Sequence, residues 1–269
     1  MENFGNSFYD LFTNVNRMIS ISFTSLFNTS NVTSMKYFFS GCLKLESISN
    51  IYHLDIRKVK DMSYFFHACF SLKSVDLSSF DTKSVTDLSG IFCGCSSLTS
   101  IVLSSFDTRN VIDLAGMFSE CSSLTSIDLS SFDTKNVIYL DEMFYFCSSL
   151  KSNNLSNFDT KKVTNLRRMS YSCSALTSIY LSNFNTQTVT DLSCMFFGCS
   201  SLASIELSNF DTQNVNDLNS MFYNWSSLAS VDLSNFYTKK SSEIARIFFY
   251  CNNLKYINIL STPYLCFSK

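Results

Sequence analysis

The segment that decides the fold is residues 123–148, SLTSIDLSSFDTKNVIYLDEMFYFCS, which is one copy of a 26-residue unit. Within it, the triplet Phe-Asp-Thr recurs every 26 residues, and only its Asp changes, to Asn185 and Tyr237. The Phe of the triplet stands at Phe80, Phe106, Phe132, Phe158, Phe184, Phe210 and Phe236. A fixed period between 20 and 50 residues indicates a solenoid whose turns stack on one another.

The unit predicts an α/β solenoid with one parallel β-sheet. Ile127, Asp128 and Leu129 alternate apolar, polar and apolar, as in a strand with one buried face. The later apolar positions are spaced by three, three, one and three residues: Val137, Leu140, Met143, Phe144 and Cys147. That spacing favours a short helix or 3₁₀ segment on the other face. We therefore expect about nine to ten turns, each made of strand, turn and short helix.

The unbroken period predicts a single elongated solenoid domain over residues 1–269, with irregular first turns at 1–70. Regular turns follow at 71–257, and a frayed end at 258–269. The third turn is one residue longer than the others, and its insertion falls near Ser49–His53.

Two core positions and the final layer depart from the regular pattern. Asn153 and Ser170 stand where other copies carry Ile or Val and Phe, so their turn is predicted to be the softest. The last turn has no polar cap, which predicts end-to-end self-association unless Pro263–Lys269 covers it.

Charge and hydropathy exclude some classes of partner. The net charge is −2, and without a basic patch no nucleic-acid partner is expected. No apolar run approaches the ~20 residues of a transmembrane segment. The N-terminus lacks the basic region of a signal peptide. The protein is therefore expected either in the cytosol or at the surface through an export signal outside this sequence.

Eight of the eleven Cys occupy one position of the unit, and Trp225 fills that position in a further copy. They are Cys42, Cys69, Cys95, Cys121, Cys147, Cys173, Cys199 and Cys251. Such a column is typical of a small buried apolar site filled by free thiols. Disulfides between stacked turns and a metal site are alternatives, but the column shows no pairwise pattern and no zinc-ligand spacing.

The motif L-x-x-I-x-L-S-x-F-D-T-x-x-V-x-x-L-x-x-M-F-x-x-C-S-S-L, over about residues 12–260, resembles the BspA-like leucine-rich repeats. The mycoplasmal, lactobacillar and protist surface proteins with Phe-Asp-Thr, Met-Phe and Cys are the most similar form. The resemblance implies a leucine-rich-repeat solenoid and a cell-surface protein engaged in adhesion or protein binding.

The sequence offers no catalytic residues, cofactor site or metal site. His53 and His67 lack the spacing of a zinc protease, and there is no phosphate-binding Gly-rich loop. One acidic column follows the repeat, at Asp81, Asp107, Asp133, Asp159 and Asp211. Calcium ligation is one interpretation of this column. The favoured one is that each Asp caps a turn beside a basic column: Lys83, Arg109, Lys135 and Lys161.

The candidate binding residues lie on the exposed face of the predicted sheet, between the two buried strand positions. They are Asp128, Asn154, Tyr180, Glu206 and Asp232. Solenoids bind partners on such faces, and an exposed Tyr is a suitable anchor. We predict a non-enzymatic scaffold that binds a protein or glycan there. The alternative is a structural spacer or surface-coat segment without a discrete ligand.

Overall fold

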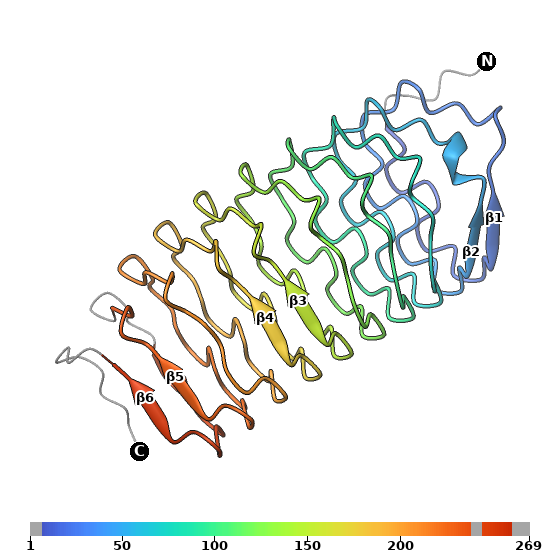
Figure 1. Ribbon diagram of the computed structural model, residues 1–269. Helices are drawn as coiled ribbons and strands as arrows, with labels where there is room; N and C mark the ends of the chain where they lie inside the picture. The colour runs from blue at the N-terminus through green and yellow to red at the C-terminus, as the bar shows by residue number, and fades with distance from the viewer. Residues whose placement is uncertain (1–6, 238–243, 260–269) are drawn as a thin grey trace.

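The described residues form an elongated stack of coils, with the first and last coils at opposite ends of the stack (Figure 1). The computed structural model describes residues 7–237 and 244–259. In chain order the elements are β1 (Ser20–Ser22), β2 (Ser47–Ser49), η1 (Ile51–His53), β3 (Ser152–Asn154), β4 (Ser178–Tyr180), β5 (Ser230–Asp232) and β6 (Tyr256–Asn258). All six strands lie along one side of the stack (Figure 1). Residues 260–269, on which the expected covering of the last layer depends, lie outside the described residues.

The strands pair in parallel at the predicted positions, but they form three separate two-stranded sheets: β1–β2, β3–β4 and β5–β6. In the second sheet, Asn153 pairs with Ile179 and Asn154 with Tyr180. Parallel pairing is thus confirmed, whereas the prediction of one continuous sheet is wrong. Residues 126–129 of the intervening coil are not part of a strand. Bonds elsewhere in each coil keep the stack in register, so these segments stay aligned without a closed ladder.

The continuous ladder runs instead through the second half of each unit. Parallel bridges link one residue per coil at Ser7, Ser34, Asp61, Asp87, Asp113, Tyr139, Asn165, Asp191 and Asp217. The predicted short helices are not confirmed here, because the residues form consecutive turns. Within the described ranges only η1 is helical.

The hydrogen bonds of this turn segment explain why it is not a helix. The amides of Leu88, Gly90 and Phe92 donate to carbonyls of the next coil, at 3.1, 2.8 and 3.1 Å. The intervening amides of Ile91 and Cys93 donate three residues back, at 3.2 and 2.9 Å. Alternate amides are therefore unavailable for the bonds of an α-helix.

The same segment contains two left-handed residues per coil, four positions apart. Gly90 and Gly94 have φ of 57° and 77°, and Glu142 and Phe146 have 56° and 55° at the equivalent positions. A left-handed residue cannot continue a right-handed helix. The amide of each such residue donates to the neighbouring coil, as Gly90 does to Ala115 at 2.8 Å, and the amide after it bonds three residues back within its own coil.

The Thr of the Phe-Asp-Thr triplet forms a second link between coils. The Thr134 hydroxyl donates to the Asp159 carbonyl at 3.1 Å and accepts the Asp159 amide at 2.8 Å. Thr108 bonds Asp133 in the same way, at 3.1 and 2.8 Å. Both hydroxyls are buried. One Thr hydroxyl thus satisfies both the amide and the carbonyl of one residue in the next coil.

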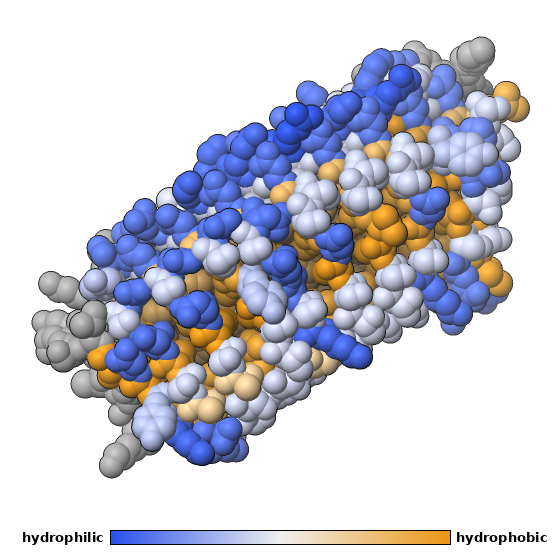
Figure 2. Space-filling model, viewed as in Figure 1, coloured by the Kyte–Doolittle hydropathy of each residue, from blue (hydrophilic) through white to orange (hydrophobic). Residues whose placement is uncertain are grey.

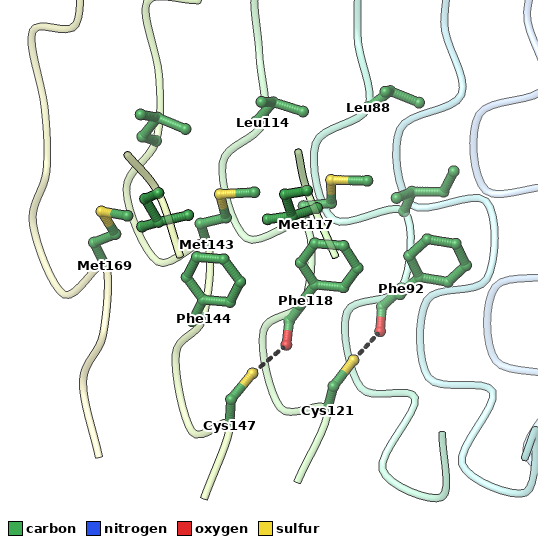
Figure 3. Packing of buried hydrophobic residues seen from close by; sticks show 14 of the residues in the cluster. Leu88, Phe92, Leu114, Met117, Phe118, Cys121, Met143, Phe144, Cys147 and Met169 are labelled. Carbon is green, nitrogen blue, oxygen red and sulfur yellow. Dashed lines mark hydrogen bonds between the residues drawn. The ribbon is translucent and has the colours of Figure 1, made fainter. Parts of the chain in front are cut away.

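The core consists of columns of identical side chains (Figure 3). The rings of Phe92, Phe118 and Phe144 stack with centroids 5.8 Å apart at both steps. Each buried thiol donates to a carbonyl near this column, as Cys121 does to Phe92 at 3.2 Å and Cys147 to Phe118 at 3.1 Å (Figure 3). The predicted burial of the Cys column is confirmed for all its members except Cys251, which is partly exposed.

The irregular positions predicted from the sequence are also irregular in the structure. The insertion of the third turn is taken up by left-handed Asn50 (φ 56°) and by η1, which follows it. Ser170 interrupts the Phe column, and its buried hydroxyl oxygen has no hydrogen-bond partner among the described residues. The same holds for Oδ1 of Asn153, which lies in the same coil and is 2% exposed. This layer therefore has buried polar groups where the other layers have apolar contacts.

Candidate functional site

The predicted binding row lies on the face that carries the strands. Asn154, Tyr180 and Asp232 are the last residues of β3, β4 and β5, whereas Asp128 and Glu206 hold the equivalent place in coils without a strand. All five are exposed, Tyr180 by 57%. Figure 2 shows an apolar stripe along this face between hydrophilic borders. Partly buried members of the strand column, such as Ile101, Ile127 and Ile205, contribute apolar surface to it.

A shallow groove of about 300 Å³ surrounds Tyr180. It is lined by Asn154, Ser156, Ile179, Tyr180, Leu181, Ser182 and Glu206. The structure thus brings three of the five predicted residues together and leaves Asp128 and Asp232 outside the groove. The apolar atoms of Ile179, Leu181 and the Tyr180 ring, beside the Glu206 carboxylate, suit a ligand with both apolar and polar groups.

The acidic members of the row are held by backbone bonds. The amide two residues further on donates to the carboxylate: Ser130 to Asp128 at 2.9 Å, and Ser208 to Glu206 at 2.9 Å. This bond lowers the pKa of Asp128, so its carboxylate is ionised at neutral pH. Hydrogen bonds from Ser234 likewise lower the pKa of Asp232. None of the ion pairs among the described residues involves the row.

The separate acidic column of the Phe-Asp-Thr triplets has the predicted structural use. The Arg109 amide donates to Asp107 at 3.2 Å, and its guanidinium contacts the same carboxylate at 2.6 Å. These contacts lower the pKa of Asp107, with the guanidinium hydrogen bond as the main cause. Lys135 pairs with Asp133 at 3.1 Å. The capping interpretation is confirmed. Among residues 7–237 and 244–259, no three His, Cys, Asp or Glu side chains are arranged to hold a metal ion.

Two other residue types with chemical potential have structural surroundings. The His67 ring bonds the Ser40 hydroxyl at 2.9 Å, and burial lowers the pKa of His67. Burial raises the pKa of the Cys173 thiol to about 12, so it remains protonated and is a poor nucleophile. No helix in the described part of the chain is long and apolar enough to cross a membrane.

Sequence reasoning missed an aromatic column in the turn segment, away from the binding row. Tyr145, Tyr171, Phe197 and Tyr223 stack with centroids 5.0, 4.4 and 4.5 Å apart. Arg168 lies over the rings of Tyr145 and Tyr171. The sequence contained the signal, because the residue that follows Phe144, or its equivalent, is aromatic in successive copies. Since the rings cover one another's faces, the column is better suited to stabilising coils than to binding a ligand.

A second feature missed from the sequence is the acidic row of the bridge ladder. Asp87 accepts both the amide and the hydroxyl of Ser89, at 2.9 and 2.7 Å. Asp113 accepts only an amide, from Ala115 at 2.8 Å, because that coil has no Ser at this position. Burial, together with the neighbouring Asp87 and Asp141, raises the pKa of Asp113 to about 6.

Comparison with known proteins identifies the repeat type. A family model described as "Mycoplasma protein of unknown function, DUF285" matches residues 6–75, 69–180 and 140–259. This confirms the expected resemblance to mycoplasmal repeats. Comparison with curated proteins gives no match.

Several solved structures are similar in part. The leucine-rich-repeat protein TpLRR of T. pallidum is 21% identical over 72% of this chain and 69% of its own, with a TM-score of 0.37. A leucine-rich cell-surface protein of Faecalibacterium prausnitzii is 17% identical over 94% and 82%, with a TM-score of 0.33. The Toll–Spätzle complex of Drosophila gives 14% over 90% and 36%, with a TM-score of 0.39. Because every score is below 0.5, no property of these proteins is assigned to the chain.

Proposed function

Since the chain belongs to the DUF285 family of mycoplasma repeat proteins, we propose that it is a non-enzymatic scaffold that binds a protein across its strand face. The Tyr180 groove is the centre of the binding surface, and the coils of residues 1–269 act as one unit. Adhesion at a cell surface is the biological role that we propose for this binding.

The groove is the observation that carries this proposal. Within it, an exposed aromatic ring adjoins apolar side chains and a carboxylate on the strand face. Interface anchors are enriched in Tyr, and they work in pockets that exclude water from their contacts. The stacked coils provide a rigid support, because each is tied to the next by turn, Thr and thiol hydrogen bonds.

A display experiment tests the proposal and requires no identified ligand. Random peptides displayed on phage are selected on the immobilised chain, and a glycan array is probed in parallel. Selected ligands are then measured against the double variant Tyr180→Ala/Glu206→Ala. We expect a loss of about tenfold or more, as for truncation of a binding hot spot.

Tyr139→Ala is the matched control, because Tyr139 is also exposed but lies in the bridge ladder away from the strand face. It should leave binding unchanged. Circular dichroism and the unfolding midpoint establish that all variants keep the fold. Ligands that bind the double variant as well as wild type would place the site elsewhere. Failure to select any peptide or glycan would favour the structural spacer.

A further inference from the structure

The exposed row has a charge pattern that the groove alone does not explain. Across the coils it reads Asp76, Val102, Asp128, Asn154, Tyr180, Glu206, Asp232 and Asn258. It contains carboxylates on both sides of Tyr180 and no Lys or Arg. The carboxylates are held in place by the amides two residues on, as Asp232 is by Ser234 at 2.8 Å. A ligand that extends along the stack beyond the Tyr180 groove therefore meets carboxylates on both sides, Asp128 on one and Asp232 on the other.

The repeat sets the spacing of these charges. Successive coils at a parallel ladder are about 4.8 Å apart. Asp128 lies two coils before Tyr180 and Asp232 two coils after it, so each is about 10 Å from Tyr180 along the stack. Polyproline II rises about 3.1 Å per residue with three residues per turn. Residues three apart in that conformation share one face and are about 9 Å apart, which matches two coils.

Resting on the proposed function, we propose that the partner is an extended basic peptide segment in the polyproline II conformation, lying along the stack. An apolar side chain enters the Tyr180 groove, and a Lys or Arg three positions away on each side faces Asp128 or Asp232. Complementary charge selects this partner against acidic segments, because like charges at the same positions would repel.

A designed peptide tests the proposal. The probe is fluorescein-labelled Arg-Pro-Pro-Leu-Pro-Pro-Arg, whose binding is followed by fluorescence anisotropy at low ionic strength. One control peptide, Arg-Arg-Pro-Pro-Leu-Pro-Pro, keeps the composition but not the spacing. A second control replaces both Arg by Glu. We expect the first probe to bind most tightly, with its affinity falling as salt is raised.

Protein variants give a second and independent measurement. Asp128→Asn and Asp232→Asn should each weaken binding of the first probe about two- to fivefold, the range of an exposed ion pair. Asn is compatible with this position, because Asn154 accepts the Ser156 amide there at 3.1 Å. Asp76→Asn is the matched control. Asp76 lies in the same row but four coils from Tyr180, beyond the reach of the peptide.

Failure of this inference is distinguishable from failure of the proposed function. Absent or spacing-independent binding of the probe overturns the basic-peptide proposal. So does an Asp76→Asn effect equal to that of Asp232→Asn. The proposed function still stands in each of these cases if display-selected ligands depend on Tyr180. It falls if the selected ligands bind independently of Tyr180, or if display and the glycan array yield no ligand.

Discussion

Replacing Asp113 by Asn should stabilise the protein at neutral pH. Asp113 lies in the bridge ladder between Asp87 and Tyr139, and its pKa of about 6 is raised from an ordinary 3.8 mainly by burial. In the unfolded chain the carboxylate ionises near pH 4, but in the folded chain only near pH 6. Stability from this group is therefore fully present below pH ~4 and is lost as the pH rises towards 6.

The size of the effect follows from the difference between the pKa of Asp113 in the folded chain and its pKa in the unfolded chain. Two pH units correspond to at most about 3 kcal/mol. Because Asp113 is only partly buried and solvent screens its charge, we expect about 1 kcal/mol. Asn can keep the Ala115 bond, since Asn165 accepts the Arg167 amide at the equivalent place, at 2.9 Å.

Urea unfolding of wild type and Asp113→Asn at pH 4.5, 6 and 7.5 measures this difference. The advantage of the variant should grow with pH. Lys36 and Asp141, which also act on Asp113, remain unchanged in both proteins. Asp191→Asn is the control, because Ser193 gives Asp191 both an amide and a hydroxyl bond, at 2.8 and 2.6 Å. That variant should be neutral or destabilised at pH 7.5. A gain for Asp113→Asn that does not change with pH would refute the reasoning.

Three further outcomes are expected. Ser170→Phe should restore the interrupted Phe column and raise the free energy of unfolding by about 1–3 kcal/mol. In wild type, amide hydrogen exchange should show residues 150–173 less protected than the coils on either side. Equal protection would contradict a weak layer. Thr134→Val should lower the free energy of unfolding by about 2–3 kcal/mol, because it leaves the Asp159 amide and carbonyl without their partner. Thr125 is exposed, so the control Thr125→Val should change this free energy by less than about 0.5 kcal/mol. Thiol titration should find the buried Cys column unreactive until denaturant is added without reductant, and disulfides detected by mass spectrometry would rule out free thiols.

The buried columns were predictable because each position is sampled many times within one chain. Val137, Leu140 and Phe144 are fully buried, as their repetition indicates. The turn segment was not predictable from spacing, because a period near three fits both a helix and a series of turns. Gly90 and Gly94 were the available signal for left-handed positions, but Glu142 and Phe146 hide it in a later copy.

The candidate site, too, was predictable from the sequence only in part. Alternation around Asp128 and Tyr180 correctly predicted which side chains are exposed, since a strand segment turns successive residues to opposite faces. The groove was not predictable, because it depends on how the Tyr180 ring lies against Ile179 and Leu181. The burial of Thr134 was also missed, because a hydroxyl in a turn is usually solvated.

The one-way hydrogen bonds of the turn segment give the whole stack an electrical axis. In the segment at residues 86–95, the amides of Leu88, Gly90, Phe92 and Gly94 point to the following coil. Of the carbonyls in this segment, only that of Thr86 receives backbone amides from that coil. Four lines of hydrogen-bonded peptide dipoles run one way along the stack and one runs the other way, which leaves a net of about three lines. An α-helix has roughly the same number, and its aligned dipoles place about half a charge at each end. The sign is opposite to that of a helix, with the positive end at the C-terminal coil. Carboxylates on the last coil and ammonium groups on the first are therefore the surface charges that this axis favours.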